Sequence, residues 1–426
     1  MRSGTNCIVS SGQVHSWSLG LLLDAKLVKD HGWKCTAAIV LSITLRAAAR
    51  CISIHAACRD LSKAPSVQAV LTALDDGLPK TLLVLERRLN DALINPLPKR
   101  MRRRAWNVAI DWHLQPYYGE PFQSRNELYY GKPKLGTTRF HAYASACIVE
   151  HGRRYTLVLT WVRRHESMVR VLRRMTARIR EIGLKIRRVL LDRAFFNGAV
   201  VAFLQEEKLP FVMPVVIRGR APKKGKKPTG LRWIKRQPAG WYPHVMKYEK
   251  QPLKISVCVG YRRHRNRKDG KQRHQKLLFA AWRVHGSPTE IRELYRLRFG
   301  IETSFRQMRQ ARIYTSTRNP RLRLFFLAVA LILRNLWVWI HHTRLAEGSG
   351  DTLTLHLELL RFKRMLEWIV REIIALFHDG SIPCVIRPVS IRLSRVACLQ
   401  AYSCERVMAR FLHCLQSPHS ASLNRV

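Results

Sequence analysis

Apolar residues recur with helical spacing over residues 20–95, which predicts a helical N-terminal region. Within it, ARCISIHAACRDL and SVQAVLTAL flank the short break SKAPS, where Ser66 after Pro65 fits a helix N-cap. Two short helices about a tight turn are typical of a helix-turn-helix that binds DNA. They are also typical of an ordinary helical hairpin, which is the commoner case, and the pattern leaves both readings open.

The spacing changes at Ala105, where short apolar runs with strand-like alternation begin. AWNVAID predicts a strand, and residues 139–150 and 153–162 predict a β-hairpin that turns at Gly152. After the hairpin we expect a helix over 167–182, a strand over 187–192, a helix over 198–207 and a strand over 209–217. This order predicts an α/β fold in which helices flank a mixed sheet.

Residues from about 218 to 285 interrupt this order with basic, turn-rich stretches around two strand-like runs, KISVCVGYRR and KLLFAAWRV. We interpret them as a β-rich basic insertion. The helical pattern resumes at Pro288 and leads to the most hydrophobic stretch of the chain, Leu322–Ile340. Two arginines and Asn335 interrupt that stretch, and a membrane span needs about 20 apolar residues, so we predict a buried core helix.

These patterns divide the chain into three parts. Residues 1–98 form a helical domain that could bind DNA ends, 99–345 form the α/β core with its insertion, and 346–426 form a weakly patterned C-terminal helical region. The junction PLPKRMRRR, residues 96–104, is either a solvated linker or, beside a DNA-binding surface, a phosphate contact.

The charge of the chain narrows its partners. Its 426 residues include 76 Lys and Arg against 28 Asp and Glu, for a formal net charge of +48. A surplus of this size favours a polyanionic partner, with nucleic acid first and an anionic membrane second. The sequence predicts no amphipathic helix with a lipid-facing side, so we expect no membrane partner.

The cysteines and the N-terminus indicate the compartment. Ten cysteines occur without a CxxC motif or zinc-finger spacing, which fits reduced thiols in a cytoplasmic protein. The apolar run Leu19–Leu23 is too short for a signal peptide.

Two acidic residues follow strand-like runs in a chain that has few acids. Asp111 closes AWNVAID and Asp192 closes RRVLLD, so both are predicted at the C-terminal ends of strands. Open α/β sheets build their sites at that edge. A single aspartate in such a place is more often a turn cap, but two of them favour a functional site.

A third acid, Glu302, lies in the helical pattern IRELYRLRFGIETSFRQMRQ. On a continuous helix with about 100° per residue, Tyr295, Arg298 and Arg309 share its face. The adjoining apolar stripe consists of Leu294, Leu297, Ile301, Phe305 and Met308. One carboxylate among two guanidiniums and a phenol suits a site for phosphate and metal, although an ordinary solvated Arg–Glu pair has the same spacing.

Three carboxylates have the chemistry to hold two Mg²⁺ ions, one activating a water or a 3′-hydroxyl and the other stabilising the leaving oxygen. Other residues leave two readings open. Tyr117, Tyr118 and Gly119 either line the site or pack a turn, and His113 is either a metal neighbour or a solvated or packed histidine. Trp233, Trp241 and Tyr242 in the insertion either stack on a base or pack the strands.

The three acidic segments together resemble the DDE transposases of bacterial insertion sequences, in the class whose RNase H-like core is split by a β-rich insertion. That class has the signature Y-x2-R-x3-E-x6-K, which reads here Tyr295, Arg298, Glu302 and Arg309. Arginine replaces lysine at the last position, which keeps the charge but changes its geometry. DRAFFN and AIDWHLQPYYG resemble the family's second and first aspartate motifs, and the resemblance covers roughly residues 20–345.

The resemblance implies that Asp111, Asp192 and Glu302 are the catalytic, metal-binding triad, and that Tyr295, Arg298 and Arg309 contact phosphates at the transposon end. It implies Mg²⁺ as the metal, as two ions, with Mn²⁺ as a substitute. The implied substrates are double-stranded DNA with terminal inverted repeats and target DNA, held by a homodimer on paired ends in the bacterial cytosol or nucleoid. The implied reaction is strand cleavage followed by strand transfer.

Two alternatives to an active transposase are weighed against these residues. One is a catalytically inactive, transposase-derived DNA-binding protein, against which the three intact acids argue. The other is a different RNase H-like nuclease, against which the signature helix and the basic surplus argue.

Overall fold

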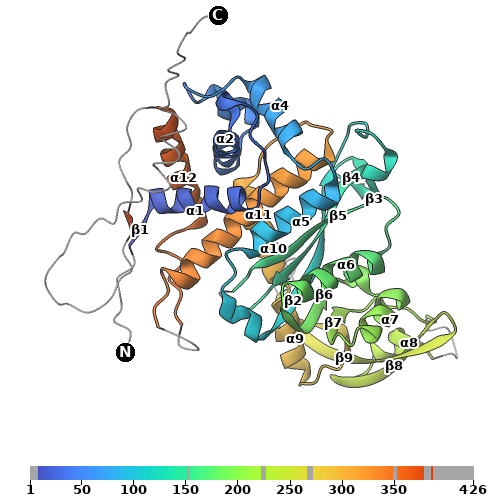
Figure 1. Ribbon diagram of the computed structural model, residues 1–426. Helices are drawn as coiled ribbons and strands as arrows, with labels where there is room; N and C mark the ends of the chain where they lie inside the picture. Colours follow the sequence, from blue (N-terminus) through green and yellow to red (C-terminus); the bar gives the residue numbers. More distant parts are fainter. Residues whose placement is uncertain are drawn as a thin grey trace, which may run out of the picture. The chain divides into compact units, whose positions relative to one another are not determined.

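The apolar runs that begin at Ala105 form the strands of a mixed β-sheet with flanking helices. The computed structural model describes residues 8–150, 153–221, 227–265, 272–348, 353–378 and 385–386 (Figure 1). The chain divides into two compact units. Leu97–Gln307 form one, called here the sheet unit, and Met1–Pro96 with Met308–Val426 form the other, called the helical unit. The domain boundaries predicted after residues 98 and 345 stay predictions, and the turn predicted at Gly152 lies outside the described residues.

Within the described residues, the sheet of the sheet unit has nine strands in the order β3-β4-β2-β6-β7-β10-β9-β8, with β5 also paired to β4. Their bounds are β2 Ala105–Pro116, β3 Tyr129–Lys134, β4 Thr137–Ile148, β5 Thr156–Val162, β6 Lys185–Leu191, β7 Phe211–Pro214, β8 Gly240–Tyr248, β9 Gln251–Arg265 and β10 Gln272–Trp282. The central strands β2, β6 and β7 are parallel, and their neighbours pair antiparallel. The predicted mixed sheet flanked by helices is therefore confirmed.

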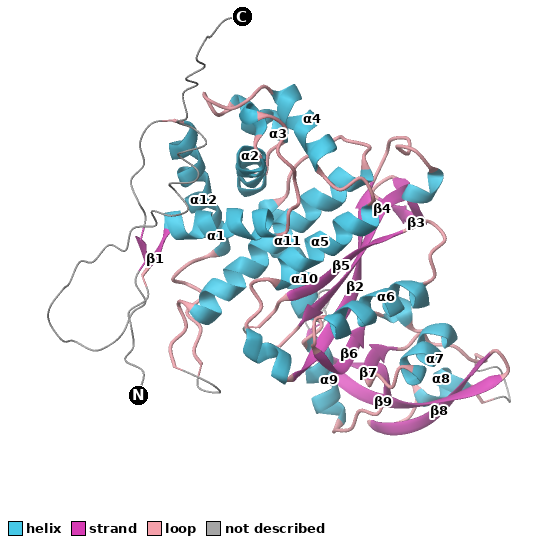
Figure 2. Ribbon diagram, viewed as in Figure 1, coloured by secondary structure: helices cyan, strands magenta, loops and turns pink. Residues whose placement is uncertain are grey.

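Successive side chains of each strand point to opposite faces of the sheet, and helices pack on both faces. Ser167 caps α6 (Met168–Glu181) and Asn197 caps α7 (Gly198–Glu206), and these two helices lie over the sheet in Figure 2. Residues that point to the opposite side join α9 (Pro288–Arg296) and α10 (Phe299–Met308) in one buried cluster. Its strand members are Ala109, Cys147, Leu190, Val212, Cys258, Phe279 and Ala281, and its helical members are Ile291, Tyr295 and Ile301.

The predicted β-rich insertion extends the main sheet. β10 pairs antiparallel with β7, and β9 and β8 follow β10 as successive antiparallel neighbours. The short helix α8 (Gly230–Ile234) contacts β8. Short 3₁₀ turns complete the unit: η2 Lys99–Arg103, η3 Arg125–Glu127 and η4 Arg193–Phe195.

The helical unit packs around one long apolar helix, α11. Its helices are α1 Ser11–Asp24, α2 Ala37–Arg50, α3 Ile54–Arg59, α4 Val67–Gly77, α5 Leu82–Ile94, α11 Pro320–Thr343 and α12 Phe362–Phe377. The 3₁₀ turns η1 (Trp33–Cys35) and η5 (Arg309–Ala311) and the strand pair β1 (Val9–Ser10) and β11 (Val385–Ile386) complete it. Ser66 caps α4 as predicted, with its hydroxyl accepting from the Ala69 amide at 3.3 Å.

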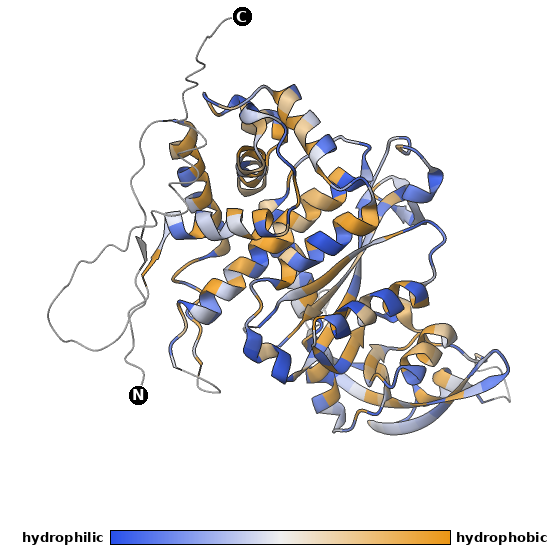
Figure 3. Cartoon of the chain, viewed as in Figure 1, coloured by the Kyte–Doolittle hydropathy of each residue, from blue (hydrophilic) through white to orange (hydrophobic). Residues whose placement is uncertain are grey.

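The core helix predicted over Leu322–Ile340 is α11. Among the described helices it alone is long and apolar enough to cross a membrane, yet 94% of its most apolar stretch is buried within the structure. Apolar residues follow one another along it in Figure 3. α12 packs on α1 and α2, and most of the C-terminal region after α12 lies outside the described residues.

Candidate active site

Asp111 and Asp192 follow the last paired residues of two parallel neighbours, β2 and β6. Ile110 pairs with Leu191, so each aspartate is the next residue along the chain after this last pair. One expectation needs correction, because β2 does not end at Asp111 but continues to Pro116 along β4. What ends just before Asp111 is the ladder to β6, so the two aspartates lie side by side at the C-terminal edge of the parallel strands.

The Asp111 side chain is mostly buried and carries two hydrogen bonds. Its Oδ1 accepts from the Trp112 amide at 2.9 Å, and its Oδ2 accepts from Arg298 Nη2 at 3.0 Å. Burial raises the pKa of Asp111, the Arg298 guanidinium and the Trp112 amide oppose the rise, and the negative charges of Asp192 and Glu302 add to it. Asp192 and Glu302 are therefore both close enough to act electrostatically on Asp111.

Asp192 is half-buried at the start of η4. Its Oδ1 accepts from the Arg193 amide at 2.6 Å, so the side chain does cap a turn, as a strand-end aspartate often does. The same residue also raises the pKa of Asp111. Capping fixes the carboxylate beside β6 and leaves it within electrostatic reach of Asp111.

The signature segment forms two helices where one continuous helix was expected. α9 begins with a capping box of Ser287 and Glu290 and ends at Arg296, and α10 begins at Phe299. In the turn between them the Arg298 amide donates to Tyr295 O at 3.0 Å, which is the tighter i+3 pattern. Helical angles measured across this turn therefore do not hold, although Tyr295, Arg298 and Glu302 still come together.

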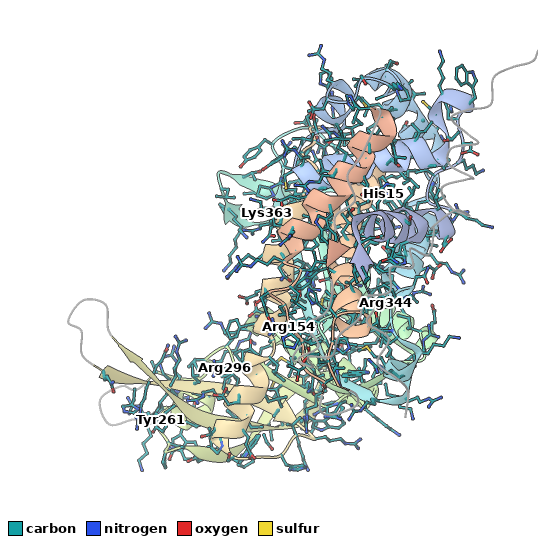
Figure 4. All side chains as sticks on the ribbon, turned by 90° about the vertical axis from the view of Figure 1, so that its left-hand side faces the viewer. His15, Arg154, Tyr261, Arg296, Arg344 and Lys363 are labelled. Carbon is teal, nitrogen blue, oxygen red and sulfur yellow. The ribbon has the colours of Figure 1, made fainter. Side chains whose placement is uncertain are left out.

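Gly300 follows the turn and marks a close approach that the spacing analysis missed. A Cβ atom there would lie 3.0 Å from Arg154 Nε, so the segment passes tightly over Arg154, two residues before β5. Arg154 is labelled in Figure 4. The glycine in the middle of the signature was the available signal, since glycine is disfavoured inside helices.

Arg298 connects the signature segment to the sheet. Its Nη1 donates to Glu302 Oε1 at 2.9 Å, and its Nη2 donates to Asp111 Oδ2. The arginine is only 5% exposed, whereas the Glu302 side chain is half-exposed. One buried guanidinium thus links a carboxylate of β2 to a carboxylate of α10.

Tyr295 lies beside this group. It is 8% exposed and packs on Phe279 at 5.0 Å between ring centroids. Burial raises the pKa of its phenol, Arg298 lowers it, and the three carboxylates raise it further. The phenol therefore stays protonated and neutral at physiological pH. Arg309, in η5, is exposed and belongs to the helical unit.

The flanking aromatics pack the edge of the sheet. His113 stacks on Phe305 at 5.0 Å between ring centroids, which is the packed alternative for this histidine. Trp112 meets the rings of Tyr129 and Phe195 edge to face, and so anchors the backbone next to Asp111. Sequence reasoning did not single out Trp112 or Phe195.

Among the aromatics of the insertion, Trp241 donates from its ring nitrogen to Gly286 O and packs on the buried cluster. Trp233 is 43% exposed and meets Tyr242 edge to face.

A family model described as the transposase DDE domain matches residues 103–336, which is more than half of the chain. The chain belongs to the DDE transposase family. This transposase is therefore a metal-dependent enzyme that cuts and joins DNA strands. Among solved structures it is similar to a piggyBac transposase in a synaptic complex with hairpin DNA, with 10% identity and a TM-score of 0.48. The likeness covers 86% of this chain and 78% of that one, and no curated protein matches significantly.

The three acids of the transposase fit a divalent cation by chemistry. They supply only carboxylate oxygens, the ligands that Mg²⁺ and Mn²⁺ prefer. As they stand, no three His, Cys, Asp or Glu side chains of the described residues are grouped closely enough to hold a metal ion. The Arg298 guanidinium lies between Asp111 and Glu302, so metal binding there requires it to turn away from at least one of them.

Proposed function

We propose that Asp111, Asp192 and Glu302 are the catalytic, metal-binding carboxylates of this transposase. The observation that carries the proposal is the register of β2 and β6, which sets two aspartates side by side at the edge where α/β sheets hold their ligands. Arg298 brings Glu302 to the same place through its shared contact with Asp111.

We further propose that Tyr295, Arg298 and Arg309 hold phosphate groups of the DNA end. Arg298 has two donors in a planar fork, which fits a phosphate as well as it fits two carboxylates. Tyr295 offers a neutral hydroxyl, since its pKa is raised by burial. Arg309 offers an exposed charge.

A divalent cation, Mg²⁺ as two ions or Mn²⁺ in its place, would supply charge that activates the attacking hydroxyl and stabilises the leaving oxygen. The protein positions the reacting groups. Asp111 is buried and its pKa is raised, and Arg298 opposes that rise and so favours the ionised form that a cation requires. The half-exposed Glu302 side chain faces the solvent side, where DNA approaches.

The substrate that we propose is double-stranded DNA: the terminal inverted repeats of the transposase's own insertion sequence, followed by target DNA. The net charge of +48 supports a polyanionic partner. We expect a homodimer on paired ends, in the bacterial cytosol or nucleoid, without a membrane partner.

The test incubates purified full-length protein with Mg²⁺ or Mn²⁺ and DNA that carries the element's ends. Asp111→Asn, Asp192→Asn and Glu302→Gln should each lower strand cleavage by at least about a hundredfold, while binding of the ends in a gel-shift assay persists. The matched control is Glu293→Gln on α9, whose carboxylate pairs with Arg292 and Arg296 away from the three acids.

Cleavage at wild-type rates by any of the three variants would overturn its assignment. Wild-type protein that binds the ends but never cuts them would favour the inactive DNA-binding descendant. Cutting without joining, at sites unrelated to the ends, would favour a different RNase H-like nuclease.

A further inference from the structure

The hairpin that joins β3 to β4 turns through an unusual pair of residues. Lys134 pairs with Thr137, so Leu135 and Gly136 form a two-residue turn. Their φ angles are +51° and +76°. Two positive φ angles define a turn whose first central position normally carries Asn, Asp or Gly, because these residues tolerate the left-handed region. A leucine there is strained.

The strained leucine is also exposed. Leu135 is 72% exposed and Tyr118 is 70% exposed. The Tyr118 hydroxyl donates to Leu135 O at 2.6 Å, which holds the ring against the turn. Together these two residues form an apolar tip at the end of the hairpin, here called the Leu135 tip. Because the leucine gains neither burial nor relaxed geometry in the folded chain, stability does not explain its presence.

Two positive charges precede the tip on β3. Lys132 and Lys134, two residues apart on β3, are both exposed, and neither forms an ion pair with a carboxylate in the described part of the chain. The nearby acids are engaged: Glu120 pairs with Arg139 at 2.9 Å, and the buried Glu127 accepts from the amides of Phe122, Gln123 and Ser124. An exposed apolar residue directly after two exposed lysines without carboxylate partners fits a polyanion that also has apolar surface.

We propose that the Leu135 tip is a DNA wedge. In this arrangement Leu135 inserts between two base pairs from the minor groove, and Lys132 and Lys134, which precede it on the same face of β3, contact phosphates of the adjacent backbone. Apolar wedges of this kind partly unstack one base step and kink the duplex. A second copy of this chain is a poorer partner, because it would bring the same lysines against each other.

The strand register gives the distance between the tip and the carboxylates, a step that rests on the proposed function. Asp111 is level with Ser145 on β4, and Thr137 begins that strand eight residues earlier. At about 3.3 Å per residue the tip lies roughly 26 Å along the sheet from Asp111. For a duplex that lies along β4, at about 3.4 Å per base pair, the unstacked step lies roughly eight base pairs from the cut phosphodiester.

The test is Leu135→Asn, which removes the wedge and relieves the strain. Asparagine tolerates positive φ, so the variant should melt at the same temperature as the wild type or higher. Its affinity for duplex DNA should fall about tenfold, which corresponds to about 1.4 kcal/mol. 2-Aminopurine placed about eight base pairs from the cut site should lose the fluorescence increase that wild-type protein produces on binding.

Matched variants separate the parts of the proposal. Leu83→Asn on α5 removes a leucine of equal exposure, 72%, and should change neither affinity nor fluorescence. Leu135→Met should retain both signals. The double variant Lys132→Gln with Lys134→Gln should reduce the slope of affinity against salt by about two, while DNA that does bind is still unstacked.

Unchanged affinity and fluorescence in Leu135→Asn would overturn the wedge. A change of oligomeric state by light scattering, with DNA binding intact, would also overturn it and make the tip a protein contact. Failure of the carboxylate assignment is separate: if Asp111→Asn still cuts DNA, the binding and unstacking results stand, and only the predicted spacing is lost.

Discussion

The two units of this transposase each bury titratable side chains, but the buried Asp111 of the sheet unit has an oppositely charged partner, whereas His15 of the helical unit has none within the described part of the chain. In the sheet unit, the buried Asp111 faces Arg298, whose guanidinium opposes the rise of its pKa. In the helical unit, burial lowers the pKa of His15 to about 4, and its Nε2 has no hydrogen-bond partner among the described residues. Burial disfavours charge in both places.

The difference indicates what each region does. His15 is held neutral by burial, and no neighbouring charge of the described residues offsets that effect. In the sheet unit, the Arg298 guanidinium partly offsets the effect of burial and so favours the charged form of Asp111. Buried ionisable groups with a specific charged partner are common at functional sites. The comparison predicts that removing the buried cation affects both activity and stability, whereas removing the histidine affects stability alone.

The largest effect is expected from Arg298→Gln. The change leaves Asp111 and Glu302 without their shared cation, and removing one partner of a buried ion pair costs about 3–5 kcal/mol. Cleavage of DNA ends should fall at least about a hundredfold. Arg298→Lys should restore part of the stability and less of the activity, since an ammonium does not fork between two carboxylates.

Urea unfolding and an end-cleavage assay measure these two effects. The control is Arg296→Gln, on the same segment, whose exposed guanidinium pairs with Glu293 at 2.7 Å (Figure 4). An exposed pair contributes at most about 1 kcal/mol. Equal behaviour of the two variants would remove the distinction drawn between Arg298 and an ordinary surface arginine.

An effect of intermediate size on the free energy of unfolding is expected when the pH is lowered, through His15. The folded-state pKa of His15 is about 4, below its ordinary 6.5, so the unfolded chain takes up a proton first as the pH falls. The stabilisation from neutral His15 is therefore complete above pH 6.5 and is lost as the pH falls towards 4. It amounts to at most about 3 kcal/mol.

His15→Phe should flatten this part of the stability profile and leave DNA cleavage at neutral pH unchanged. Melting temperatures of wild type and variant, measured between pH 4 and 7, provide the comparison. Parallel profiles would mean that His15 is not the group that titrates.

The smallest effect is expected at the exposed turn of the sheet unit. Leu135→Asn should raise the free energy of unfolding by up to about 1 kcal/mol, because it relieves a left-handed leucine without disturbing buried contacts. Chemical denaturation measures the gain. A lower free energy of unfolding would contradict this prediction, because it would show that Leu135 makes stabilising packing contacts.

The amino-acid sequence predicted the elements well wherever local periodicity determines them. The strands around residues 105–217, the cap at Ser66 and the buried helix over Leu322–Ile340 all follow from spacing and capping chemistry. Prediction was poorer where the outcome depends on a neighbour in space. The end of the strand at Asp111 was misplaced because β2 continues along β4, and the break near Arg298 was missed.

The candidate site shows the same division. The positions of Asp111 and Asp192 after strand-like runs and of Glu302 in a helical pattern made them candidates, and the resemblance to the transposase family implied that they form one triad. The contact of Arg298 with both Asp111 and Glu302 was not visible, since it joins residues 187 apart in the chain. The strain at Leu135 was equally hidden, because a φ angle follows from the register of β3 and β4.

By itself, then, the sequence determined the class of fold and predicted a polyanionic partner and three candidate acids, since composition, local spacing and the family resemblance carry that information. Only the tertiary structure decided which charges are buried, which cation faces them and which apolar residue is exposed. Burial and pairing depend on residues far apart in the chain, and their effects on charge arise from the low polarity of the surroundings that the fold creates.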